Sequence, residues 1–136
     1  MFAKNESASS AVEFAILAPV FLMLVIGMLA YGIYFGAAHT VQQLAADAAR
    51  ATISGLSAPE RSRIVDDFIE RNASAYILID KRRLTHTAKD SRTDPDQYVV
   101  EVSYDASLLP IWSLYPPIPL PSPTISFAST IRKGGR

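Results

Sequence analysis

The strongest pattern along the chain is one long apolar run near its N-terminus. Residues 14–38 contain no charged side chain. As a helix rising about 1.5 Å per residue, these 25 residues exceed the roughly 30 Å hydrocarbon core of a bilayer. The pattern therefore predicts a transmembrane helix over residues 9–38. Three aromatic residues mark its far interface, as in an aromatic belt: Tyr31, Tyr34 and Phe35.

A cleaved secretory signal peptide is the alternative interpretation of this run. The small residues 36–38 offer a cleavage site, but the apolar core of a signal peptide is typically about 7–15 residues long. A carboxylate, Glu13, also stands where signal peptides favour positive charge, so a retained helix fits better. The weak positive bias of Lys4 and the amino terminus places the N-terminus in the cytoplasm and the C-terminus outside.

The helical pattern continues beyond the apolar run. It predicts a helical stalk over residues 39–56, with Gly55 as its stop. One side of this stalk is apolar or small: Val41, Leu44, Ala45, Ala48, Ala49 and Thr52. Ser57 is a good N-cap, followed by Pro and Glu in a first turn, and it predicts a second helix over residues 59–77.

The period of the pattern then changes from helical spacing to alternation. Residues 83–89, 97–105 and 124–132 alternate apolar and polar side chains, which is typical of strands with one covered face. A polar turn over residues 90–96 joins the first two strands. The chain is therefore predicted as α+β: a long N-terminal transmembrane helix extending into a stalk, then a second helix and a small three-stranded antiparallel sheet. Residues 57–136 form the small extracytoplasmic domain.

Between the last two strands lies a proline-rich segment, residues 108–123, with six of the nine prolines. Such a segment favours extended polyproline geometry. It is unusually apolar and contains the single tryptophan, Trp112, close to Tyr115. Two interpretations stand: a loop folded back over a small sheet core, or a partner surface built on Trp112 and Tyr115.

Composition excludes several kinds of function. The formal net charge is zero and no basic stripe with interleaved aromatic residues occurs, so we expect no nucleic-acid partner. The chain has no cysteine, which removes disulfides, thiolate metal sites and thiol nucleophiles. His39 and His86 show no metal-ligand spacing, and no phosphate loop or nucleophile motif is present. We therefore expect no catalytic residue, no metal and no cofactor.

Three features of the apolar run carry candidate function. Glu13 lies at the N-terminal end of the run, where a carboxylate is costly unless it reaches the lipid headgroups or pairs with a positive group. Pro19 lacks an amide hydrogen and should bend the first turns. Gly32 and Gly36 have the spacing that lets a second helix approach closely in lipid.

Residues 9–21, Ser-Ser-Ala-Val-Glu-Phe-Ala-Ile-Leu-Ala-Pro-Val-Phe, closely resemble the start of the TadE-like family, the pilin-like proteins of tight-adherence (Flp type IVb) pilus systems. Residues 43–51, an Ala-rich stretch with Asp and Arg, resemble the same family. The resemblance implies a single-pass bacterial inner-membrane protein without catalysis, either a minor pilin or an assembly factor. Its implied partners are the lipid bilayer, other pilin-like subunits and the pilus-assembly machinery.

The resemblance also implies a processing site and a register contact. A prepilin peptidase would cut between Ala8 and Ser9, which removes residues 1–8 as a leader and leaves Glu13 as the fifth residue. The family pattern has Gly before the cut, where this chain has Ala8. The new ammonium on Ser9 would pair with Glu13 of a neighbouring subunit, with Phe14 and Pro19 completing the motif. The alternative is an uncleaved membrane-tethered extracytoplasmic binding module that uses the Trp112 loop.

Overall fold

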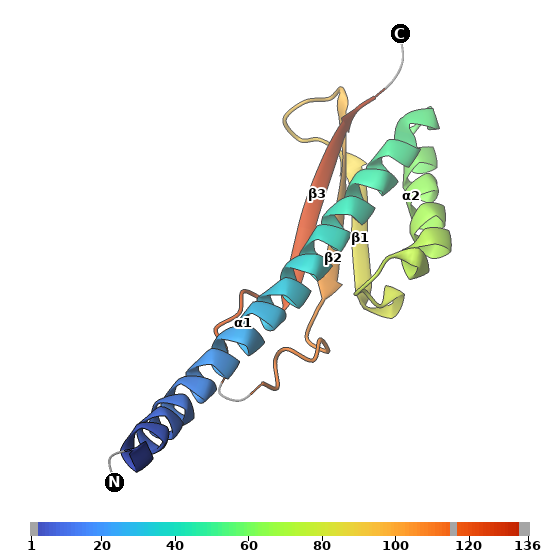
Figure 1. Cartoon of the computed structure of the whole chain (residues 1–136). Helices are drawn as coiled ribbons and strands as arrows, with labels where there is room; N and C mark the ends of the chain where they lie inside the picture. Colours follow the sequence, from blue (N-terminus) through green and yellow to red (C-terminus); the bar gives the residue numbers. More distant parts are fainter. Residues whose placement is uncertain (1–2, 115–116, 134–136) are drawn as a thin grey trace. The chain divides into compact units, whose positions relative to one another are not determined.

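The computed structural model describes residues 3–114 and 117–133, with side chains from residue 8 onward. Two helices come first, α1 (Ala3–Ala51) and α2 (Ala58–Asn72), and three strands follow, β1 (Leu84–Asp90), β2 (Gln97–Asp105) and β3 (Thr124–Arg132) (Figure 1). Short 3-10 turns connect them: η1 (Thr52–Ser54), η2 (Ala73–Ala75) and η3 (Lys81–Arg83). The strands form one antiparallel sheet in the order β1-β2-β3, which confirms the predicted α+β class.

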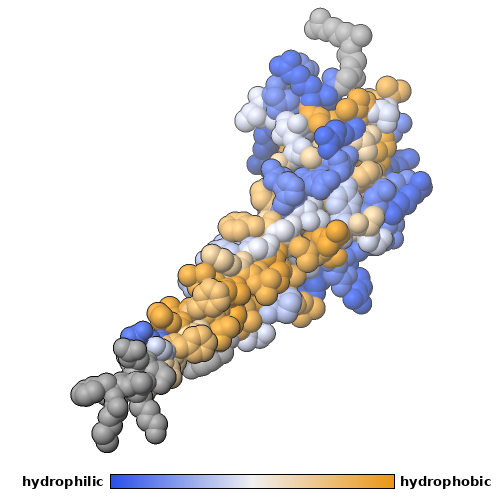
Figure 2. Space-filling view, in the orientation of Figure 1, coloured by the Kyte–Doolittle hydropathy of each residue, from blue (hydrophilic) through white to orange (hydrophobic). Residues whose placement is uncertain are grey.

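The chain divides into two compact units, Met1–Gly32 (unit 1) and Ile33–Arg136 (unit 2). In the described part of unit 1, large apolar side chains are exposed along α1; Phe14 is 72 % exposed and Met28 is 68 % exposed. Figure 2 shows these hydrophobic residues covering the N-terminal part of the helix, whereas hydrophilic residues dominate the visible face of unit 2. Among the described residues, the helical stretch Ala8–Ser54 contains the one segment long and apolar enough to cross a membrane.

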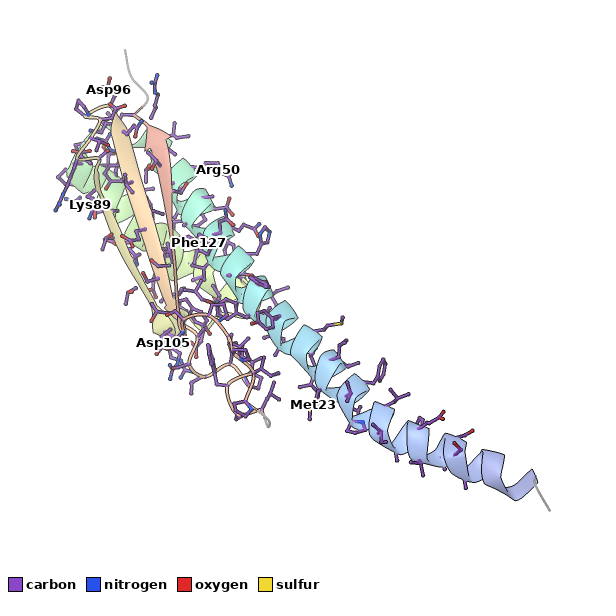
Figure 3. All side chains as sticks on the ribbon, turned by 90° about the vertical axis from the view of Figure 1, so that its left-hand side faces the viewer. Met23, Arg50, Lys89, Asp96, Asp105 and Phe127 are labelled. Atoms are coloured by element: carbon purple, nitrogen blue, oxygen red, sulfur yellow. The ribbon has the colours of Figure 1, made fainter. Side chains whose placement is uncertain are left out.

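The core of unit 2 lies between the second half of α1, α2 and one face of the sheet (Figures 1 and 3). The predicted apolar side of residues 41–52 is confirmed, because every member of it is buried: Val41, Leu44, Ala45, Ala48, Ala49 and Thr52. Most of these side chains are small, so the helix backbone approaches its neighbours closely. The residues expected as a stalk are thus the central helix of unit 2.

The sheet follows the predicted alternation. Alternate residues of β2 are buried: Tyr98, Val100, Val102 and Tyr104. The pairing Val102 with Phe127 and Tyr98 with Ile131 keeps the apolar positions of β3 on the same face. β2 and β3 span the predicted residues, whereas β1 begins one residue late because η3 occupies the chain as far as Arg83.

The second helix is shorter than predicted. Its start is as expected, since Ser57 Oγ accepts a hydrogen bond from the Glu60 amide at 3.3 Å. It ends at Asn72 rather than at residue 77, and Asn72 donates its side-chain amide to the Phe68 carbonyl at 2.8 Å. Tyr76 leaves the helix with extended backbone, and its hydroxyl donates to Asp47 Oδ2 at 2.7 Å. This tertiary hydrogen bond competes with a continuation of α2 beyond Asn72.

Opposite ends of unit 2 are closed by different contacts. At one end, Arg61 is only 8 % exposed and donates from Nη1 to the Gly55 carbonyl at 2.9 Å. Its guanidinium lies over the Tyr98 ring, 5.2 Å from the centroid. We call this the Gly55 end. At the other end, where the chain enters unit 2, the Tyr34 hydroxyl donates to the Ser122 carbonyl at 2.9 Å, and we call it the Tyr34 end.

Candidate assembly site on the N-terminal helix

The residues of the proposed processing motif all lie on α1. Ala8, Ser9 and Glu13 are exposed in unit 1, as are Phe14 and Pro19. Glu13 follows Ser9 by four residues, so the two lie on one side of the helix, about 6 Å apart along its axis. Among the side chains that the structure describes, none forms an ion pair or hydrogen bond with Glu13.

Pro19 interrupts the hydrogen-bond ladder of this helix without ending it. Because its nitrogen carries no hydrogen, Pro19 cannot donate to the carbonyl of Ala15, one turn earlier. The surrounding surface is apolar and slightly hollowed, with a volume of about 700 Å³. It is lined by Phe14, Leu17, Ala18, Val20, Phe21, Leu22 and Leu24. Such a surface fits acyl chains or the side chains of another apolar helix.

The two glycines predicted for helix packing have different surroundings. A Cβ added to Gly32 would meet nothing within 4 Å, so the surface at this residue is open. A Cβ added to Gly36 would lie 2.8 Å from Leu78 Cδ1 of the same chain. The close approach at Gly36 is therefore made within unit 2, and Gly32 is the glycine whose surface stays free.

The proline-rich loop folds back over unit 2 at the Tyr34 end. Trp112 is half-buried, its Nε1 donates to the Ala106 carbonyl at 2.7 Å, and its ring meets the Tyr34 ring edge-on at 6.4 Å. Ile111 beside it is 2 % exposed. These contacts agree with the interpretation of a loop covering the core, and a partner surface at Trp112 stays a prediction. Tyr115 lies outside the described residues.

Sequence reasoning missed the role of Tyr34. It was expected in the aromatic belt of the membrane helix, but it is only 7 % exposed and holds the loop through Ser122 and Trp112. An aromatic residue near the end of an apolar run looks the same in the sequence whether it lies at the membrane interface or packs inside a folded domain. A contact between residues 88 positions apart leaves no mark in local periodicity.

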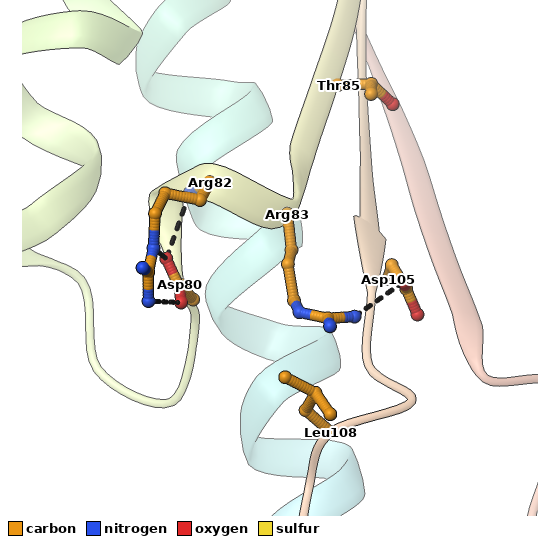
Figure 4. Close-up of a pocket in the computed structure, with 6 residues that line it drawn as sticks. All are labelled: Asp80, Arg82, Arg83, Thr85, Asp105 and Leu108. Atoms are coloured by element: carbon orange, nitrogen blue, oxygen red, sulfur yellow. Dashed lines mark hydrogen bonds and ion pairs between the residues drawn. The ribbon is translucent and has the colours of Figure 1, made fainter.

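A polar hollow lies in unit 2 (Figure 4). Its volume is about 620 Å³, and two ion pairs line it: Arg82 with Asp80 at 2.8 Å and Arg83 with Asp105 at 2.7 Å. The side-chain hydrogen bond from Arg82 lowers the pKa of the Asp80 carboxyl to about 2. Each charge is thus neutralised within the chain, and the hollow shows no nucleophile paired with a base.

The two histidines stand apart from any candidate metal site. His39 is exposed, and His86 Nε2 lies 2.7 Å from Asp66 Oδ1, where it links β1 to α2. Within residues 8–114 and 117–133, no group of three or more His, Asp and Glu side chains is close enough to hold a metal ion.

A comparison with known protein families finds a match on the N-terminal helix α1. Residues 8–50 match the model of the TadE family, described as TadE-like protein. The segment is TadE-like. The match confirms the resemblance inferred from residues 9–21 and 43–51, and the TadE-like segment contains Ser9, Glu13 and Pro19. Searches of curated proteins and of solved structures found no match to the chain. A TadE-like segment on a helix able to cross a membrane indicates a membrane protein related to the Tad pilus.

Proposed function

We propose that this chain is a minor pilin or pilus-assembly protein of a tight-adherence system, anchored in the bacterial inner membrane and non-catalytic. The observation that supports the proposal is the TadE-like match over residues 8–50, a segment in which Glu13 precedes a run of exposed apolar side chains. In this role α1 crosses the membrane once through its N-terminal half, and unit 2 lies outside the cytoplasm.

A register contact between neighbouring subunits follows from the charge of Glu13. A prepilin peptidase would cut between Ala8 and Ser9 and create an ammonium on Ser9. Glu13 has no pairing side chain among those described, so pairing with the Ser9 ammonium of a neighbour would offset the cost of holding a carboxylate near lipid. Phe14 and Pro19 would then lie in the helix interface, with the open surface at Gly32 further along.

The N-terminus of the mature protein tests this proposal most directly. The protein is expressed with its own pilus system, purified from membranes and analysed by intact mass spectrometry. We expect Ser9 as the first residue. An Ala8→Gly variant serves as the matched control, because it restores the residue of the family pattern and should be cut at least as completely. A mature chain that begins at Met1 in both proteins would overturn the pilin route, and a start near His39 would indicate a secreted protein.

One observation favours a second candidate function. Ala8 stands where the family pattern has Gly before the cut. If the chain is never cut, it is a membrane-tethered extracytoplasmic binding module rather than a pilus subunit. Deletion of the protein would then leave pilus number unchanged, whereas a minor pilin or assembly factor is required for normal piliation.

A further inference from the structure

The Tyr34 end of unit 2 is the end at which helix α1 enters the unit. β2 runs between the two ends: Tyr98 meets Arg61 at the Gly55 end, and Ala106, just beyond the strand, binds Trp112 at the Tyr34 end. Figure 3 likewise shows Asp96 and Asp105 at opposite ends of this strand. Gly32 and Ile33 are consecutive residues of the continuous helix α1. Along the sequence, Tyr34 follows Leu29, an exposed apolar residue of unit 1, by five residues of the same helix.

Exposed aliphatic side chains gather at the Tyr34 end. Ile77 is 77 % exposed and Leu78 is 41 % exposed in the segment after α2, and Leu78 lies against Gly36 of α1. Leu108, which is 68 % exposed, belongs to the loop that Trp112 closes, and it borders the hollow of Arg83 and Asp105 (Figure 4). Two segments distant in sequence thus expose aliphatic side chains at the end where α1 enters.

Leu78 adopts a conformation that leucine rarely takes. Its φ is 67°, the only positive value among the non-glycine residues that the structure describes. A bulky residue in this region is strained by an amount on the order of 1–3 kcal/mol, so the surroundings must hold it there. Contact with Gly36 supplies part of this support, and the turn keeps Ile77 and Leu78 at the Tyr34 end.

The polar groups around these residues suit a headgroup layer. Lys81, Arg82 and Arg83 of η3 are long cationic side chains next to the aliphatic residues, and each is paired with a carboxylate: Glu70, Asp80 and Asp105, respectively. Trp112, which is half-buried, adds an aromatic type that is enriched at membrane–water interfaces. Since the pairing leaves little free positive charge, this surface needs no acidic lipid to bind.

We propose that the Tyr34 end of unit 2 rests in the lipid headgroup layer, with Ile77, Leu78 and Leu108 as its lipid-contacting residues. This inference rests on the proposed membrane anchoring of unit 1. Burial of three aliphatic side chains among headgroups removes apolar surface from water, and it would restrict the domain to one orientation on the bilayer. The partner is thus the bilayer that holds the anchor, and the lipid contact extends from unit 1 onto unit 2.

Site-directed spin labelling tests the contact, since the chain has no native cysteine. Full-length Ile77→Cys and Leu108→Cys variants are labelled in phosphatidylcholine proteoliposomes, and their accessibility to oxygen and to a water-soluble nickel complex is compared. Leu56→Cys is the matched aqueous control, because Leu56 is 89 % exposed at the Gly55 end. Leu29→Cys, from an exposed residue of unit 1, reports insertion of the anchor. We expect oxygen to be favoured several-fold at positions 77 and 108 and nickel at position 56, with no change when acidic lipid is added.

The outcomes separate this inference from the proposed function. A lipid signal at position 29 with aqueous signals at 77 and 108 would overturn the headgroup contact and leave the anchor intact. An aqueous signal at 29 would overturn the anchor and this inference with it. Labels at 77 and 108 shielded from both reagents would indicate a protein partner and would also overturn the lipid contact. An Ile77→Asp/Leu108→Asp variant should reduce quenching of Trp112 by brominated lipid, whereas Leu56→Asp should not.

Discussion

Leu78 and Gly36 occupy adjoining space so closely that a Cβ on Gly36 would lie 2.8 Å from Leu78 Cδ1. The contact joins the turn after α2 to the first residues of α1 within unit 2. It explains a glycine that the sequence pattern assigns to contacts between membrane helices. A larger residue at Gly36 would displace Leu78 from its positive-φ turn.

Replacing Gly36 with leucine should destabilise unit 2 by about 1–3 kcal/mol, because overfilling a packed contact forces side chains or backbone to move. Gly32→Leu is the matched control, since the space at Gly32 is open. The measurement is urea unfolding of the full chain in detergent micelles, followed by the fluorescence of Trp112. Equal destabilisation by both variants would contradict the role assigned to Leu78.

Arg61→Met should lower the free energy of unfolding by about 1–3 kcal/mol. The variant removes the donor to the Gly55 carbonyl and the cation above the Tyr98 ring, while it keeps an apolar side chain of similar length. Arg63→Met is the control on the exposed side of α2 and should change the free energy by less than about 0.5 kcal/mol. Similar unfolding midpoints for the two variants would show that the buried contacts of Arg61 add little.

Unit 2 should lose stability at alkaline pH through Tyr76. Burial, followed by the hydrogen bond to Asp47, raises the pKa of Tyr76 to about 12, above the ordinary 10.0. The folded state therefore favours the protonated hydroxyl, and this contribution is complete below about pH 10 and lost as pH rises to about 12. A Tyr76→Phe variant should show a smaller decline over this interval. Part of the decline should remain, because burial also raises the pKa of Tyr98. If the stability of Tyr76→Phe declined with pH as much as that of the parent protein, Tyr76 would not be a cause of the decline.

Glu13→Gln should abolish or strongly reduce pilus assembly while the cut after Ala8 proceeds normally. Loss of one partner from a pair held near lipid costs about 3–5 kcal/mol, which would weaken each subunit contact. Glu13→Asp keeps the charge and should retain part of the assembly. Mass spectrometry of the N-terminus and the amount of pilus protein sheared from cells measure the two steps separately. Normal pilus assembly in both Glu13→Gln and Glu13→Ala would contradict the proposed register contact.

Local pattern was sufficient to predict the elements that bury one regular face. Residues 41–52 and β2 each carry their buried positions at the expected period, and the structure buries those side chains. The family resemblance of residues 9–21 and 43–51 likewise needed no tertiary information.

Contacts between distant segments account for what the sequence did not predict. Tyr76 leaves α2 early to reach Asp47, and Tyr34 turns from an expected membrane belt into an anchor for the loop. Leu78 at positive φ contradicts local preference altogether. In each case a partner 29 or more residues away along the chain, or a strained turn, outweighs the local tendency.

The two halves of the TadE-like segment of α1 lie in different surroundings. Before Gly32 most of its large apolar side chains are exposed, whereas the buried positions near its end, such as Ala45, Ala48 and Ala49, lie inside unit 2. The second half of the segment thus describes an interior surface of a folded domain. Any chain that carries this face must supply a covering layer of its own, whatever sequence builds that layer.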